Sequence, residues 1–264
     1  MPPPAPLVLD PAAFAERMET SARRSGLKVA TFGRIGGVPL LALTGRTPGP
    51  RPRIYLSAGI HGDEPAPPLA LLEMVEAGIF DQRAVWFVCP LLNPAGFLAR
   101  TRGNGAGLDL NRDYRHLLSE EIRAHTRWLA AQPCFDLALC LHEDWEAGGF
   151  YLYEITAQPT PGLARAIVAA AATRCPLERS ATIDGWAVTE PGIIHPGADP
   201  AVREAWPESI YLQAQLTPLG YTFETPSGLP LAQRIAAHRA AVEAAVTGAL
   251  ERWQETRVPT RRRG

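Results

Sequence analysis

The 264-residue sequence has a single lysine, Lys28, so arginine carries nearly all of its positive charge. Neither sign of charge dominates: the formal net charge is -1, which offers no general attraction to nucleic acid or to an anionic membrane. No apolar run reaches the roughly 18 residues that a membrane-spanning helix requires. These absences exclude the nucleic-acid-binding and membrane-embedded classes as first hypotheses.

Cysteine is also scarce, and no Cys-x-x-Cys pair occurs among the four residues Cys89, Cys134, Cys140 and Cys175. This spacing in a chain of this length favours neither a disulfide framework nor a cysteine-bound metal. The N-terminal residues MPPPAPLVLD have neither a basic region nor a continuous apolar segment, so they do not resemble a signal peptide. We therefore expect a cytoplasmic protein.

The length suits one large α/β domain. We expect an N-terminal helix and hairpin over residues 1–52, a core over 53–254 and a disordered tail over 255–264. Apolar strand-like runs alternate with helical patterns, which predicts a mainly parallel sheet with helices on both faces.

The pattern predicts the following elements. A helix is expected over 11–24, with Asp10 as its capping residue, and a second helix is expected to end at residue 76. Further helices are expected over 119–131, 162–174 and 229–253. Strands are expected over 27–32, 38–44, 54–56, 84–89, 135–141, 150–155 and 219–223. An irregular stretch over 95–116, long enough to indicate function, lies between them. Residues 183–211 show no clear pattern.

Three polar clusters follow predicted strands directly. They are His61 with Glu64, then His142, and finally Glu224. Ligands of open α/β sheets gather at the carboxyl ends of the strands, so these clusters are expected to share one crevice. By itself, a His-x-x-Glu pair also fits a turn histidine and a helix-starting glutamate, and a lone histidine also fits a buried core position.

Together, two histidines and a carboxylate are a catalytic zinc set that leaves a fourth position open for water. We predict that His61, Glu64 and His142 bind one zinc ion. Glu224 would then be the unligated carboxylate that takes a proton from water and returns it to a leaving amine.

The irregular stretch supplies polar side chains of a second kind. Arg102, Asn111 and Arg112 are candidates for recognising a carboxylate and a developing oxyanion, because a guanidinium binds carboxylates bidentately and stays charged. The alternative is a solvated basic loop paired with surface acids. Asp109 could accept a hydrogen bond from the free ring nitrogen of a zinc-bound histidine.

Six motifs, HGDE, NPAGF, RTRGN, GLDLNRDY, LHED and FETPS, occur in an order that resembles the M14 zinc carboxypeptidases and their relatives. The resemblance runs from about Arg53 to Glu224. It implies an α/β/α sandwich around a mixed, mainly parallel eight-stranded sheet. It also implies zinc ligands at His61, Glu64 and His142, and a general base at Glu224.

The resemblance assigns further roles within the irregular stretch. Arg102 corresponds to the arginine that polarises the scissile carbonyl. Asn111 and Arg112 correspond to the pair that holds the substrate's C-terminal carboxylate, and Asp109 to the residue that supports the first histidine ligand.

The sequence departs from the family pattern at a tyrosine that often stands about twenty residues before the base. Tyr211 is the candidate substrate-binding tyrosine here, although it also fits a core aromatic. Glu143 and Asp144 would either select a basic substrate group or cap a turn. We expect residues 183–208 to shape the specificity pocket.

The sequence thus predicts a zinc metallocarboxypeptidase that acts on small peptides with a free carboxylate. An N-acyl-amino-acid deacylase like aspartoacylase and succinylglutamate desuccinylase is the alternative, because these enzymes share HGxE and DLNR. Cell-wall peptides are a further substrate class, which the missing export signal disfavours. A catalytically silent carboxylate-binding module is the non-enzymatic alternative.

Overall fold

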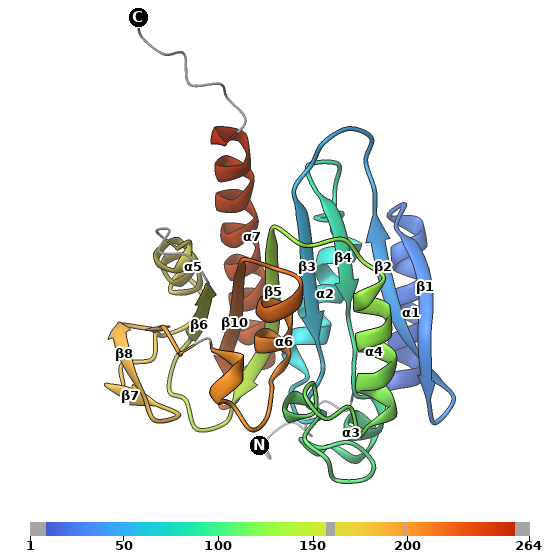
Figure 1. The fold of residues 1–264 in the computed structure, drawn as a ribbon, viewed down its shortest axis with the longest axis horizontal. Helices are drawn as coiled ribbons and strands as arrows, with labels where there is room; N and C mark the ends of the chain where they lie inside the picture. Colours follow the sequence, from blue (N-terminus) through green and yellow to red (C-terminus); the bar gives the residue numbers. More distant parts are fainter. Residues whose placement is uncertain (1–8, 157–161, 198, 257–264) are drawn as a thin grey trace, which may run out of the picture.

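The computed structural model describes residues 9–156, 162–197 and 199–256. A ten-stranded sheet crosses the molecule in the order β1-β2-β4-β3-β5-β10-β6-β9-β8-β7 (Figure 1). Most of the tail expected over 255–264 falls outside the described residues. The last helix includes Glu255.

Four parallel strands form the centre of the sheet. They are β3 (Arg53–Ala58), β4 (Val85–Cys89), β5 (Leu137–Asp144) and β10 (Leu219–Pro226). Their continuous apolar sequences are buried on both faces, as expected for strands covered by helices on either side. Because the strands are parallel, their carboxyl ends lie at the same edge of the sheet.

The flanks of the sheet are mostly antiparallel. On one side β1 (Lys28–Ile35) and β2 (Val38–Gly45) form the expected hairpin. On the other side lie β6 (Tyr151–Thr156), β9 (Ile193–Ile194), β8 (Trp186–Glu190) and β7 (Thr182–Ile183).

The predicted α/β class is confirmed, but the predicted number of strands, eight, is wrong. Three of the ten strands are the short strands β7, β8 and β9, with two, five and two residues. They lie in the segment whose sequence shows no regular alternation. The description "mainly parallel" holds for the centre of the sheet only, since both flanks contain antiparallel pairs.

Helices cover both faces of the sheet. One face packs against α1 (Pro11–Arg24), α2 (Ala66–Glu76), α5 (Ala164–Ala171) and α7 (Leu231–Glu255), and the other against α4 (Glu120–Ala130) and α6 (Glu208–Gln215) (Figure 1). The expected cap of α1 is present, since the Asp10 side chain accepts hydrogen bonds from the backbone of Ala12 and Ala13. Among the described residues, no helix combines the length and apolar character that crossing a membrane requires.

The stretch over 95–116 is more regular than its composition predicts. It contains most of α3 (Pro94–Ala99) and the short 3₁₀ helix η1 (Leu110–Arg112). The Asn93 side chain caps α3 by accepting a hydrogen bond from the Gly96 backbone at 2.8 Å. Glycine-rich composition concealed these short helices, because capping and packing rather than intrinsic propensity stabilise them.

A buried polar network joins α4 and α6 to the sheet. The His125 ring lies 2.8 Å from the Tyr114 hydroxyl through Nδ1 and 2.9 Å from the Tyr55 hydroxyl through Nε2. Tyr55 in turn donates to Glu208 Oε1 at 2.7 Å. Burial lowers the pKa of His125 to about 3, so its ring is neutral at physiological pH.

This network predicts a pH dependence of stability. The pKa of His125 is lower in the folded chain than in the unfolded chain, so unfolding takes up a proton between about pH 6.5 and pH 3. Stability from this residue should be fully present above pH 6.5 and should fall with pH across that window. His125→Gln, whose amide can both accept and donate, should make the pH slope of the unfolding free energy shallower by about one proton. Urea titrations from pH 3.5 to 7.5 measure the pH slope of the unfolding free energy for both proteins. An equal slope in the two would contradict the prediction, because it would mean that His125 is already charged in the folded protein.

Candidate metal centre and substrate pocket

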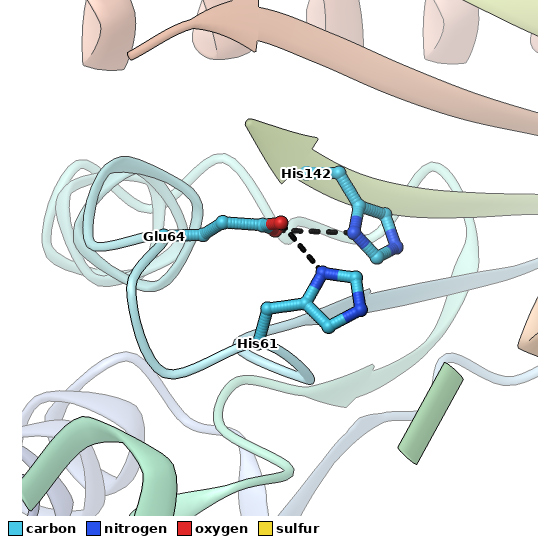
Figure 2. Close-up of side chains that lie close together, drawn as sticks. All are labelled: His61, Glu64 and His142. Carbon is cyan, nitrogen blue, oxygen red and sulfur yellow. Dashed lines mark hydrogen bonds and ion pairs between the residues drawn. The ribbon is translucent and has the colours of Figure 1, made fainter. Parts of the chain in front are cut away.

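The Glu64 carboxylate faces two histidine rings that lie next to each other (Figure 2). Its Oε1 is 2.5 Å from His61 Nδ1, and its Oε2 is 3.1 Å from His142 Nδ1. One ligand atom from each residue lies within 4.8 Å of the other two, and all three side chains are buried. Residues from two separate predicted strand ends therefore meet at one point.

A tight turn after β3 places His61 and Glu64. Gly59 adopts a left-handed φ of 67°, and its carbonyl accepts hydrogen bonds from the backbone of Leu92 and Asn93. The Asn93 side chain also donates to the Ile60 carbonyl at 3.1 Å. The turn is thereby fixed against the segment that follows β4.

His142 lies within a strand, whereas the sequence placed it just beyond one. β5 continues to Asp144 because its last residues pair with β10, with His142 opposite Glu224. Paired residues of neighbouring strands project to the same face of a sheet. This register therefore brings the predicted base beside a predicted ligand.

The charges in this cluster stabilise one another. Burial opposes a charge on His61, but Glu64 and Asp109 outweigh it and raise the pKa of His61 to about 9. Burial would likewise raise the pKa of Glu64, but the two histidines lower it well below its usual range. A buried carboxylate is thus matched by cationic neighbours, a role that a metal ion can also fill.

The donor set suits a divalent cation. Two imidazole nitrogens and a carboxylate oxygen face one another in a buried site, and these donors match zinc. Asp109 Oδ1 lies 3.2 Å from His61 Nε2, the ring nitrogen directed away from Glu64. This contact fixes the orientation of the ring and leaves Nδ1 for a metal.

Glu224 lies half-buried in the pocket beside the cluster. Burial raises the pKa of Glu224 well above its usual value, and the charges of Glu64 and Asp144 act in the same direction, while His142 opposes them. A carboxyl group with a raised pKa can both accept and return a proton.

Arg102 and Asp109 contact the ligand cluster and each other. Arg102 Nε donates to Asp109 Oδ2 at 3.0 Å, and Arg102 Nη1 lies 3.7 Å from Glu64 Oε1. Asp109 thus contacts both Arg102 and His61. The guanidinium is half-exposed toward the pocket, where it can donate to a bound oxygen.

Asn111 and Arg112 also line the pocket. Asn111 Oδ1 accepts a hydrogen bond from the Glu208 backbone at 2.9 Å, which leaves the amide nitrogen of Asn111 for other partners. Arg112 is exposed, and its Nη1 donates to the Asn111 carbonyl at 2.8 Å.

The pocket has a volume of about 590 Å³ and is lined by His61 and Glu64 of the metal cluster and by these polar residues. Several residues of the segment 183–208 line it, as the sequence analysis expected: Asp184, Trp186, Pro196, Arg203, Glu204, Ala205 and Pro207. The structure does not bring Tyr211 to the pocket. Tyr211 belongs to α6, and its ring packs against the ring of Tyr114, with the ring centres 5.5 Å apart.

Glu143 and Asp144 have structural hydrogen-bond partners. Glu143 Oε2 accepts from the backbone of Ala66 at the start of α2, at 2.8 Å, and Oε1 forms an ion pair with Arg234. Asp144 accepts from the backbone of Glu146 and from the Tyr151 hydroxyl, both within 2.8 Å. These contacts favour the capping alternative over selection of a basic group.

Sequence reasoning missed the aromatic wall of the pocket. Tyr151, Tyr153 and Ile155 alternate along β6, where they lie opposite Glu224, Thr222 and Gly220 of β10. Alternation within β6 was visible in the sequence, but its pairing with β10 was not. Sequence reasoning also missed Arg203, which stands 21 residues before Glu224, where a tyrosine was sought.

Comparisons with known proteins agree with this fold. A model of the succinylglutamate desuccinylase/aspartoacylase catalytic domain matches residues 50–193. A crystal structure of a candidate metallopeptidase from Shewanella amazonensis SB2B is 27% identical, with a TM-score of 0.78 over 89% of this chain and 92% of that one.

More distant structures share the fold. A metallo-carboxypeptidase from Burkholderia cenocepacia is 20% identical, with a TM-score of 0.67 over 90% of this chain and 68% of its own. Carboxypeptidase A from Helicoverpa armigera is 14% identical, with a TM-score of 0.66 over 89% and 71% of the respective chains. No curated protein matched the sequence.

The turn that carries the metal cluster predicts a sharp requirement for glycine at position 62. A Cβ on Gly62 would lie 1.9 Å from the carbonyl carbon of Gly96, so α3 would have to move. We expect Gly62→Ala to lower the unfolding free energy by about 1–3 kcal/mol or more. Gly228→Ala is the matched control, since no atom lies within 4 Å of a Cβ there. Equal stability of the two variants in urea titrations would contradict this packing.

Proposed function

The chain belongs to the succinylglutamate desuccinylase/aspartoacylase catalytic-domain family, and on this premise we propose that it is a zinc-dependent metallocarboxypeptidase. Its substrate would be a small peptide whose C-terminal amide bond is hydrolysed. The observation that carries this proposal is that His61, Glu64 and His142 meet at one point, with Glu224 paired to His142 and lining the adjoining pocket.

His61, Glu64 and His142 would hold the zinc ion. When bound, zinc supplies a Lewis acid that polarises the scissile carbonyl and makes water more acidic. Asp109 keeps the His61 ring oriented for this purpose through its contact with Nε2.

Glu224 moves the protons in this proposal. Its carboxylate takes a proton from the attacking water and delivers it to the amide nitrogen, which then leaves as an amine. Burial favours the protonated form of the carboxyl between these two steps, since it raises the pKa of Glu224.

Arginine side chains orient the substrate and receive its developing charge. Arg102 donates to the carbonyl oxygen as negative charge accumulates on it, while its ion pair with Asp109 fixes the guanidinium. Asn111 and Arg112 bind the terminal carboxylate, which selects a bond at the end of a chain.

The family match supports a second candidate, a zinc-dependent deacylase of N-acyl amino acids. The same residues could perform that reaction, because an N-acyl amino acid also places an amide next to a free carboxylate. The two candidates differ in the group on the acyl side, an amino acid in one and a simple acid in the other. Substrates of both kinds are therefore needed to distinguish the two reactions.

Loss of a ligand should remove the metal. We expect about one zinc per chain in the unaltered protein, and His142→Ala should lose most of it because two donors remain. Asp109→Ala should weaken zinc binding roughly 10- to 100-fold, since Asp109 supports the ligand His61 and is not itself a ligand. Metal analysis after dialysis against a chelator measures both effects, and full zinc retention by His142→Ala would refute the ligand set.

Replacement of the base should abolish turnover without loss of zinc. Glu224→Gln should reduce kcat by about 10²–10⁴-fold on a panel of dipeptides and N-acyl amino acids. Glu146→Gln is the control, since Glu146 is an exposed acid that lines the same pocket. Cleavage of the N-acyl compounds alone would favour the deacylase. No cleavage by either form, with intact ligand binding, would favour the silent carboxylate-binding module.

A further inference from the structure

Arg203 presents an unsatisfied cation to the pocket. Its Nη2 donates to the Gly197 carbonyl at 2.6 Å, and its guanidinium lies over the Trp186 ring, 5.7 Å from the centroid. Its Nε is buried and has no hydrogen-bond partner among the described residues. A buried donor without a partner is costly, so this side chain is arranged for a partner that the chain itself does not supply.

Arg112 is the second arginine without a charged partner here. Within the described residues, neither Arg112 nor Arg203 has a carboxylate oxygen within 4 Å. Burial lowers the pKa of Arg203, and the positive charge of Arg112 acts in the same direction. Two guanidinium groups that repel each other in one pocket create a place for an anion.

The nearby acids do not fill this place. Asp144 accepts hydrogen bonds from Tyr151 and Glu146, and Asp184 accepts from the Tyr153 hydroxyl at 2.7 Å. Their contacts lie on the β6 side of the pocket. Besides Arg102, which is paired with Asp109, Arg112 and Arg203 therefore remain as cations available to a ligand.

The backbone holds these two arginines in a fixed relation. Residues 203–208, here named the strap, are bound to residues 109–116, here named the clamp loop. Four contacts join them: Arg115 Nη1 to the Arg203 carbonyl, His116 Nε2 to the Glu204 carbonyl at 3.0 Å, Tyr114 N to the Trp206 carbonyl at 3.3 Å, and Glu208 N to Asn111 Oδ1 at 2.9 Å. The positions of Arg203 and of the Asn111–Arg112 pair are thus set together, although the two segments are far apart in the sequence.

We propose that Arg203 is a substrate-binding residue that completes the carboxylate clamp opposite Arg112. This inference rests on the proposed function, in which Asn111 and Arg112 hold the carboxylate next to the scissile amide. A carboxylate has two oxygens and about four lone-pair sites, so it can accept hydrogen bonds from two guanidinium groups. Arg203 would thereby discriminate a free carboxylate from an amide or ester.

The test measures binding, so that it does not depend on turnover. In the Glu224→Gln protein, ligand-observed NMR titrations would compare N-acetylglycine with N-acetylglycinamide, which lacks the carboxylate charge. We expect Arg203→Gln to weaken binding of the acid by about 10- to 100-fold and to leave the amide unchanged. Arg203→Lys, which keeps the charge but loses the bidentate geometry of the guanidinium, should weaken binding of the acid less. Arg46→Gln, an exposed arginine that follows β2, is the control for net charge and should bind as the parent does.

Two results would overturn the inference. Equal losses for acid and amide, or no loss for either, would mean that Arg203 does not recognise the carboxylate. If binding of N-acetylaspartate, titrated as a third ligand, is weakened by Arg203→Gln while that of N-acetylglycine is not, Arg203 is assigned to a side-chain carboxylate instead. Thermal unfolding of each variant shows whether it is folded, and Arg203→Lys carries the comparison if Arg203→Gln is not. If the unaltered protein cleaves no amide, but Arg203→Gln weakens binding of the acid and not of the amide, the proposed function fails and this inference stands.

Discussion

The structure depends on a buried carboxylate that contacts two imidazole rings. Removing a charge from water is expensive unless partners surround it, and one oxygen of Glu64 contacts His61 while the other contacts His142. The surrounding packing serves this arrangement. Gly62 allows α3 to approach the turn, and β5 carries His142 into the parallel centre of the sheet. The site is thus built from the geometry of the fold rather than from one local motif.

Much of this arrangement could be predicted because its signals are local. Strand-like runs ending in polar residues indicated where His61, His142 and Glu224 would lie, and the parallel topology brings such ends to one edge. The Asp10 cap likewise fixed the start of α1. The extension of β5 through His142 was not predictable, because it depends on pairing with a strand some 80 residues later in the chain.

The pocket wall was less accessible to sequence reasoning for the same physical reason. Tyr151 and Tyr153 reach the site only because β6 pairs with β10, and Arg203 only because the strap is tied to the clamp loop. Tyr211 was chosen for its chemical type, yet its ring packs on Tyr114 and does not line the pocket. Short strands and loops without periodicity carry this part of the molecule, and tertiary hydrogen bonds decide where their side chains point.

The central claim is that one metal ion binds where the three side chains meet. Anomalous diffraction at the zinc edge, from crystals of the protein supplied with zinc, tests this most directly. The account predicts a single strong peak within about 2.0–2.2 Å of His61 Nδ1, His142 Nδ1 and a Glu64 oxygen. An absence of density at this point, or a zinc ion bound elsewhere in the chain, would contradict it.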